Sequence, residues 1–256
     1  MLRIFMIVMI ALAGCKPDDG AVGPVGPKGD TGDAVPAQQA LFRAGVSPEG
    51  SYSVTLDDVD RANPDTAYPD VGTMPLANAA GDHPRRLLLR FPVVGYIPSN
   101  ASITGAVLQL TTVSTTSIDA GVTIGVYDLS QPVMTDGGTQ CIWTIGATWN
   151  RFDGSVLWGN CGNPVTVFSK GVHYPENPMD SVVVPSAASG TDMLWAWNLD
   201  ISAVQKWLDT PAKNNGVLVS SANEWSDTAV GTLVFGHNAH STERFRPTLL
   251  VTYTIP

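Results

Sequence analysis

The chain has 256 residues, of which 44% are hydrophobic and 14% are charged, and its formal net charge is −9. Because an acidic chain with few lysines has no basic surface for a phosphate backbone, we expect no nucleic-acid partner. The excess of acidic over basic residues also excludes adhesion to anionic lipid by charge alone. The length is enough for one all-β domain with shorter segments beside it.

The first 14 residues have the pattern of an export signal. Arg3 gives a positively charged start, and residues 4–13 form an almost unbroken apolar run. A membrane helix needs about 20 apolar residues, so this shorter run predicts a signal peptide (residues 1–14) instead. The cleavage region, Leu12-Ala13-Gly14-Cys15, resembles the bacterial lipobox. The resemblance implies that Cys15 carries lipid; the alternative is an ordinary signal peptide that a cysteine happens to follow.

A lipid on Cys15 would make the protein membrane-anchored rather than secreted. One acyl chain binds a membrane only marginally, whereas two hold it stably, and lipobox cysteines are diacylated. Lys16 follows the cysteine, where an Asp would signal retention in the inner membrane. We therefore expect a cell-envelope protein, at the outer membrane or cell surface rather than the inner membrane.

Glycine recurs at every third position after the expected anchor, at residues 20, 23, 26, 29 and 32. This period is the requirement of the collagen triple helix, in which only Gly fits at the axis. Five triplets are short for a stable triple helix, and the alternative is a semi-extended spacer. Residues 15–36 are thus predicted to be a lipidated, extended or disordered tether, with a homotrimer as the alternative to a simple spacer.

Residues 37–256 have the pattern of an all-β domain. Short runs rich in Val, Leu, Thr and aromatic residues alternate with clusters of Gly, Pro, Asn and Asp. The expected strands are 52–57, 86–93, 103–113, 121–128, 165–169, 181–185, 193–199, 216–221, 232–236 and 248–254. One short helix is expected at 201–208, with Ser202 and Gln205 as a capping box. Two antiparallel sheets packed face to face fit this pattern.

Motifs between Pro64 and Tyr253 resemble those of one known family. In chain order they are Pro64-Asp65-Thr66-Ala67-Tyr68, Arg86-Leu87-Leu88-Leu89-Arg90-Phe91, Ile103-Thr104-Gly105-Ala106-Val107-Leu108-Gln109-Leu110, Ala147-Thr148-Trp149-Asn150 with Trp158, Trp197-Asn198-Leu199-Asp200-Ile201, Val204-Gln205-Lys206-Trp207, Asn214-Asn215-Gly216-Val217-Leu218 and Arg246-Pro247-Thr248-Leu249-Leu250-Val251-Thr252-Tyr253. In this order they resemble the motifs of DNRLRE domains, although 141–145 and 240–243 depart from the family pattern. The resemblance implies a jelly-roll β-sandwich, of which some relatives bind acidic polysaccharides such as alginate.

The cysteines predict one disulfide. If Cys15 carries lipid, Cys141 and Cys161 remain, and a pair in an oxidising compartment indicates a bond. Closing a loop of this size would stabilise the fold by about 3 kcal/mol. The alternative is two buried free thiols.

An acidic cluster raises the possibility of a structural calcium ion. Its members are Asp57, Asp58, Asp60, Asp65 and Asp70. Calcium takes six to eight oxygen ligands, and such a loop supplies several carboxylates. The alternative is a solvated acidic loop, and no cofactor is required by the pattern.

Exposed aromatic and arginine side chains are the candidate sugar contacts. Trp143, Trp158 and Trp225 lie in or beside polar loops, where an aromatic face can stack on a sugar ring. Arg86 and Arg90 share one strand face and could pair with uronate carboxylates, although paired charges on an exposed face are the alternative. Trp149, Trp197 and Trp207 are expected in the core.

No recognisable catalytic arrangement is present in the sequence. It has no Gly-x-Ser-x-Gly elbow, and no carboxylate pair stands in the apolar setting that tunes a general acid. His237 and His240 are expected in a surface loop rather than at a zinc site. We therefore expect a protein that is not an enzyme. Two functions remain open: binding of extracellular polysaccharide, or a structural or adhesive role in the envelope without a sugar site.

Overall fold

The computed structural model describes residues 35–43, 52–57, 73–78, 85–116, 121–129, 135–136, 139–140, 170–171, 174–185, 191–221 and 231–256. Val35–Pro256 form one compact unit, which holds all of these residues. Residues 1–34, which include Cys15 and the glycine repeat, lie outside the described part. Within that part, no helix is both long and apolar enough to cross a membrane.

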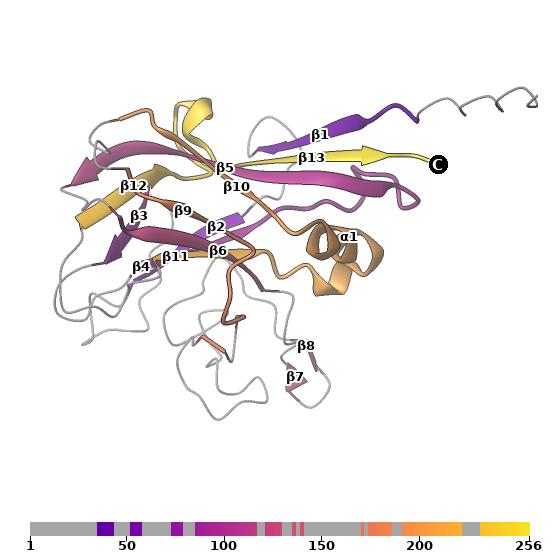
Figure 1. Cartoon of the computed structure of the whole chain (residues 1–256), viewed down its shortest axis with the longest axis horizontal. Helices are drawn as coiled ribbons and strands as arrows, with labels where there is room; N and C mark the ends of the chain where they lie inside the picture. Colours follow the sequence, from indigo (N-terminus) through magenta and orange to yellow (C-terminus); the bar gives the residue numbers. More distant parts are fainter. Residues whose placement is uncertain are drawn as a thin grey trace, which may run out of the picture. The chain divides into compact units, whose positions relative to one another are not determined.

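Two antiparallel sheets build the domain, which confirms the predicted all-β sandwich (Figure 1). The six-stranded sheet has the order β1 (Gln38–Arg43), β13 (Thr248–Thr254), β5 (Ser102–Thr116), β12 (Gly231–Gly236) and β3 (Thr73–Asn78), and β10 (Leu194–Asn198) also pairs with β5. The five-stranded sheet has the order β2 (Tyr52–Asp57), β4 (Arg85–Arg90), β11 (Val217–Ser221), β6 (Thr123–Asp128) and β9 (Asp180–Val183). A small hairpin joins β7 (Thr135–Asp136) and β8 (Thr139–Gln140).

The long strand β5 organises the six-stranded sheet. Its Leu108 is paired with Leu249 of β13 on one side and with Trp197 of β10 on the other. Two register shifts, at Val234/Phe235 of β12 and Thr252/Tyr253 of β13, mark irregularities in the pairing with β5. Successive side chains of a strand point to opposite faces, and only one face of β5 meets the core, which explains its alternating buried side chains.

The core lies between the two sheets. Every second residue of the main strands points into it, as the period of a strand requires. The buried residues include Leu87, Leu89, Leu108, Leu110, Ile124, Val126, Trp195, Trp197, Val217, Val219, Leu233, Phe235, Leu249 and Val251. Trp197 and Trp207 are fully buried, which confirms that prediction, while Trp149 lies outside the described residues.

The helix α1 (Ile201–Asp209) confirms the predicted helix but not its predicted cap. The N-cap is Asp200, whose side chain accepts a hydrogen bond from Ser202 N at 2.8 Å. Gln205 instead reaches the start of β5, where its Oε1 accepts from Ile103 N at 2.9 Å. The capping box was therefore wrong, because the carboxylate of Asp200, two residues before Ser202, caps the helix instead.

Most predicted strands in the described part are present with slightly different ends, and 165–169 lies outside that part. The sequence did not predict β1 or β3. In β1 only Phe42 is buried, so its hydrophobic alternation is weak. In β3, Pro75 weakens the strand pattern, yet β3 pairs only with β12 at the edge of its sheet, where proline is tolerated.

Candidate functional site

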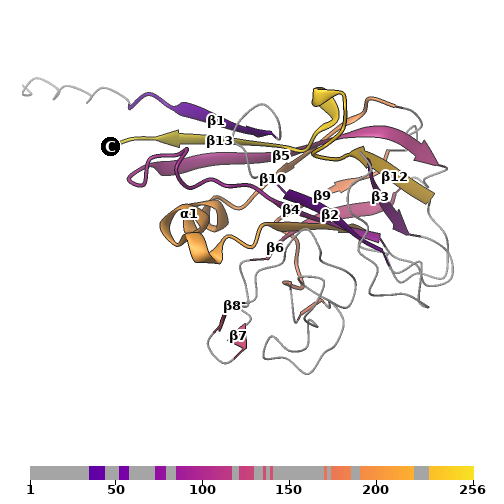
Figure 2. The ribbon, with the colours of Figure 1, turned by 180° about the vertical axis from the view of Figure 1, so that it is seen from behind.

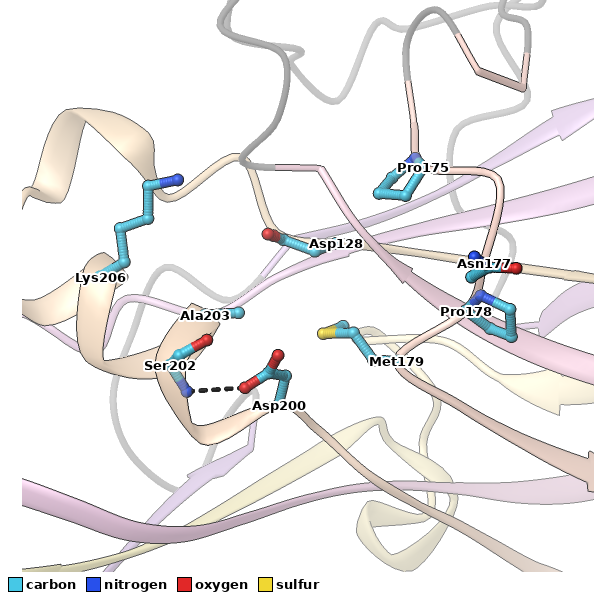
Figure 3. A pocket seen from close by; sticks show the side chains of 9 residues that line it. All are labelled: Asp128, Pro175, Asn177, Pro178, Met179, Asp200, Ser202, Ala203 and Lys206. Atoms are coloured by element: carbon cyan, nitrogen blue, oxygen red, sulfur yellow. Dashed lines mark hydrogen bonds between the residues drawn. The ribbon is translucent and has the colours of Figure 1, made fainter.

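A cavity of about 340 Å³ opens beside the first turn of α1 (Figure 3). Three elements meet there: the end of β6, the segment 175–179 that leads into β9, and α1 with its cap. The lining residues are Asp128, Pro175, Asn177, Pro178, Met179, Asp200, Ser202, Ala203 and Lys206. In Figure 3 the carboxylates of Asp128 and Asp200 are directed toward the same space.

Main-chain hydrogen bonds hold the walls of this cavity in place. Met179 N donates to Val126 O at 2.7 Å, which ties the segment 175–179 to β6. Asp180 follows, and its Oδ2 accepts from Asn198 N at 2.7 Å. This second bond links β9 of one sheet to β10 of the other, just before the helix cap. The cavity therefore rests on regular elements of both sheets.

The lining combines two kinds of chemical group. Asp128, Asn177, Asp200, Ser202 and Lys206 supply carboxylate, amide, hydroxyl and ammonium groups, whereas the prolines, Met179 and Ala203 supply apolar surface. Two carboxylates against one ammonium leave one formal negative charge. Five of the nine lining residues are polar or charged and none is aromatic, so this cavity is more polar than most small-molecule sites, which are lined mainly by hydrophobic and aromatic side chains.

The predicted sugar-stacking tryptophans do not belong to the described part of the chain. Trp143, Trp158 and Trp225 all lie outside it, and so do Cys141 and Cys161 of the predicted disulfide. The structure therefore does not test the predicted sugar stacking or the predicted disulfide.

The predicted calcium ligands are also mostly outside the described residues. Asp58, Asp60, Asp65 and Asp70 lie outside, while Asp57 is the last residue of β2 and is in register with Arg85 of β4. Among the residues that the structure describes, no three His, Cys, Asp or Glu side chains are grouped as metal ligands would be.

Arg86 is not a surface residue, which corrects the predicted arginine pair. Its exposed fraction is 1%, and its guanidinium lies 5.5 Å from the centroid of the Tyr174 ring. Tyr174 in turn meets Tyr127 edge to face at 5.2 Å. The outer face of β4 is thus covered, so both the uronate contact and the exposed charged face were wrong for Arg86. Arg90, on the same strand face, is partly exposed.

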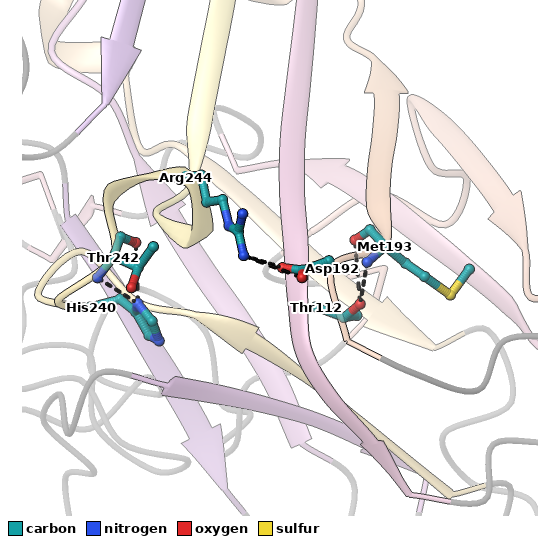
Figure 4. Close-up of polar contacts among 6 residues, drawn as sticks. All are labelled: Thr112, Asp192, Met193, His240, Thr242 and Arg244. Carbon is teal, nitrogen blue, oxygen red and sulfur yellow. Dashed lines mark hydrogen bonds and ion pairs between the residues drawn. The ribbon is translucent and has the colours of Figure 1, made fainter.

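Other arginines are engaged within the protein (Figure 4). Arg244 forms an ion pair with Asp192 at 3.0 Å, and its guanidinium lies 4.9 Å from the Phe245 ring centroid. Arg246 Nε donates to His240 O at 2.9 Å. The Arg244–Asp192 pair joins the turn before β10 to the loop before β13, and the Arg246 bond lies within that loop.

The two C-terminal histidines shape a loop. His237 is buried, and its Nδ1 accepts from Ala239 N at 3.4 Å. His240 Nδ1 accepts from Thr242 N at 3.1 Å, and its ring packs on Phe245 at 4.9 Å. Both residues lie in a loop, as expected, but His237 is buried rather than at the surface.

The cavity residues were missed by sequence reasoning. Asp128 and Asp200 are far apart in the chain and come together only through the pairing of β6 and the docking of α1. The one local signal was Asp200, an N-cap residue type directly before the predicted helix. Trp195 was also missed as a core residue; it stacks on Trp197 at 6.4 Å.

Comparison with protein-family models finds no match to this chain, and comparison with curated proteins finds none either. The resemblance to DNRLRE domains therefore stays a prediction. The structural observations that bear on function are the fold and the cavity beside α1.

Proposed function

We propose that residues 35–256 are a non-catalytic module that binds extracellular polysaccharide, and that a lipid on Cys15 holds this module at the cell envelope. The cavity beside α1 is the observation that supports this function. A sugar unit presents hydroxyl groups around a ring and apolar C–H faces above and below it. The lining offers partners for both, with carboxylate, amide and ammonium groups next to two prolines and Met179.

The charge of the cavity favours neutral or amino sugars over uronates. Its two carboxylates outnumber its one ammonium group, and the whole chain carries a formal net charge of −9. A polyuronate would meet repulsion at contact, where screening by salt is weak. The preference for acidic polymers that the family resemblance implied is thus not supported by the cavity.

The absence of catalysis is part of the proposal. In a glycosidase, one carboxyl group acts as the general acid and a second acts on the opposite face of the sugar. Here Asp200 is exposed and its Oδ1 accepts from Ser202 N at the start of α1. A carboxylate engaged in holding a helix end fits a binding role better than proton transfer to a leaving group.

Isothermal titration of residues 35–256 against a neutral glucan, an amino-sugar polymer and alginate tests this function. We expect binding to the first or second and weaker binding to alginate. Lys206→Ala should lower affinity about 10- to 150-fold, because a charge-assisted hydrogen bond contributes about 1.5–3 kcal/mol. Lys213→Ala, outside the cavity on the neighbouring 3₁₀ turn, is the matched control.

Two results would overturn the proposal. Release of reducing ends from a bound polymer would make the protein an enzyme. Absence of binding to all three polymers would leave the structural or adhesive role as the better explanation.

A further inference from the structure

The cavity beside α1 opens where β6 runs past its partner strand. β9 is in register with β6 as far as Val126, and Met179 N donates to Val126 O at 2.7 Å. β6 continues to Asp128, while the chain on its β9 side belongs to the segment 175–179. Val126 points into the core, so Asp128, two residues later, points to the same side of the strand. The core-facing row of β6 therefore ends in a carboxylate that lines the cavity.

The helix α1 supplies a second wall. Figures 1 and 2 show α1 at the same end of the domain as the C-terminus. Ser202, Ala203 and Lys206 are three or four residues apart and share one face of the helix. Asp200 Oδ1 accepts from Ser202 N at 2.8 Å, which offsets the partial positive charge at the start of the helix. Among the described residues, Oδ2 of this carboxylate has no hydrogen-bond or ion-pair partner, so it is available to a ligand.

The charges of the cavity do not cancel each other by direct contact. The carboxylates of Asp128 and Asp200 face the same space in Figure 3. Lys206 forms no ion pair with any residue in the described part of the chain. The lining thus keeps two carboxylates and one ammonium group around a volume of about 340 Å³, with one formal negative charge in excess. A ligand with one positive charge would balance this excess.

The third wall restricts the chemistry of that ligand. Pro175, Pro178 and Met179 supply apolar surface. A bare calcium ion needs six to eight oxygen ligands, which such a wall does not provide. No three His, Cys, Asp or Glu side chains are grouped within the described ranges either. The ligand that fits all three walls has a cationic group on one side and an apolar face on another.

We propose that the cavity binds an amino sugar whose amine is free and protonated, with the ammonium group of the sugar between Asp128 and Asp200. This inference rests on the polysaccharide-binding function proposed above and names the class of sugar. A glucosamine unit carries one positive charge next to several hydroxyl groups. Its hydroxyls suit Ser202 and Lys206, and its ring C–H groups suit the two prolines. N-acetylation replaces the charge by a neutral amide, so the cavity should discriminate against the acetylated sugar.

Isothermal titration of the full chain in detergent, with four trimers of equal length, tests this inference. The trimers are those of glucosamine, N-acetylglucosamine, glucose and lysine, at a mildly acidic pH at which the sugar amine is protonated. We expect the glucosamine trimer to bind about 5- to 10-fold tighter than the other two sugars, because a charge-assisted hydrogen bond is stronger than a neutral one and solvent weakens an exposed ion pair. The lysine trimer should bind more weakly, since it has ammonium groups but no sugar ring. It controls for general attraction to a chain with a net charge of −9.

Three variants connect the preference to the cavity. Asp200→Ser keeps a capping oxygen for α1 and removes the carboxylate, so it should abolish most of the preference for glucosamine over N-acetylglucosamine. Lys206→Ala should weaken the binding of every sugar but raise this preference, because it removes repulsion between two ammonium groups. Asp209→Ser is the matched control: its carboxylate lies on the same helix outside the cavity and accepts from Gln205 Nε2 at 2.9 Å. This variant should keep the preference of the wild type.

The outcomes separate this inference from the function on which it rests. Equal affinity for the three sugars, or tighter binding of the N-acetylated trimer, would overturn the inference and leave polysaccharide binding intact. So would a lysine trimer that binds as tightly as glucosamine. Equal losses of preference in Asp200→Ser and Asp209→Ser would show that the amine responds to the net charge of the chain and not to the cavity. Absence of binding by all three sugars would contradict both proposals.

Discussion

The indole Nε1–H of Trp197 donates a hydrogen bond to the main-chain carbonyl of Ile124 at 3.1 Å. Trp197 belongs to β10 of the six-stranded sheet and Ile124 to β6 of the five-stranded sheet, and both residues are buried. This polar contact therefore crosses the core and links the two sheets. Because apolar packing between sheets is not directional, this bond, like the one from Asn198 N to Asp180 Oδ2, helps to fix how one sheet lies on the other.

Trp197→Phe should lower the free energy of unfolding by about 1–3 kcal/mol, since it removes a buried hydrogen bond and some packing. Trp195→Phe is the matched control. Trp195 is also buried on β10, but its Nε1 has no hydrogen-bond partner among the described residues, so only packing is lost. Urea unfolding of both variants measures the difference. Equal losses would mean that the bond to Ile124 contributes nothing.

Gly216→Ala should be severely destabilising. Gly216 has φ +77°, and an added Cβ would meet the carbonyl of Leu89 on the neighbouring strand β4. Strain and backbone displacement together should cost about 3 kcal/mol or more. Gly95→Ala separates the two effects, because Gly95 has φ +85° but open space around its Cβ, and it should cost about 1 kcal/mol. Thermal melting gives the comparison.

Arg86→Ala should destabilise the fold by about 2 kcal/mol or more, because it removes a buried guanidinium packed on Tyr174. The folded fraction should keep its affinity for sugar. Arg90→Ala, on the same strand face but partly exposed, should cost less. Unfolding curves and titrations on the same samples separate stability from binding. A loss of affinity at unchanged stability in Arg86→Ala would return this residue to a binding role.

Asp200→Ala should affect both helix and cavity. Loss of the N-cap bond to Ser202 costs about 1 kcal/mol. Asp200→Ser keeps a capping oxygen and removes the carboxylate, so it should restore most of the stability without restoring any carboxylate contact to the ligand. Stability is measured by denaturation and affinity by titration. If Asp200→Ser binds sugar as the wild type does, this carboxylate is only a cap.

If Cys15 carries the proposed lipid, Cys15→Ser should release the protein from membranes or leave the expected signal peptide uncleaved, because the thiol proposed to receive the lipid is gone. Cys141→Ser, which keeps the lipobox, should still fractionate with membranes. Cell fractionation and intact-mass measurement of the mature chain check both. A Cys15→Ser variant that stays membrane-bound at normal mature mass would contradict lipid anchoring.

Local sequence was enough to predict most strands and the helix. Alternating Leu87, Leu89 and Phe91 point to the core as expected, and the apolar side of 201–208 packs inward through Val204 and Leu208. These features depend on periods of two or 3.6 residues, which any short window of sequence contains. The strands β1 and β3 were not predicted, because edge strands need little apolar alternation and tolerate proline.

Only the tertiary structure decided what covers each face of a strand. The same alternation that directed Leu87 inward left Arg86 on a face that looked exposed, and it is buried because Tyr174, far along the chain, packs over it. The cavity has the same origin, since Asp128 and Asp200 meet through β6 and α1. The alternation of a strand decides on which face a side chain lies. Whether that face is buried depends on long-range contacts that the local period does not encode.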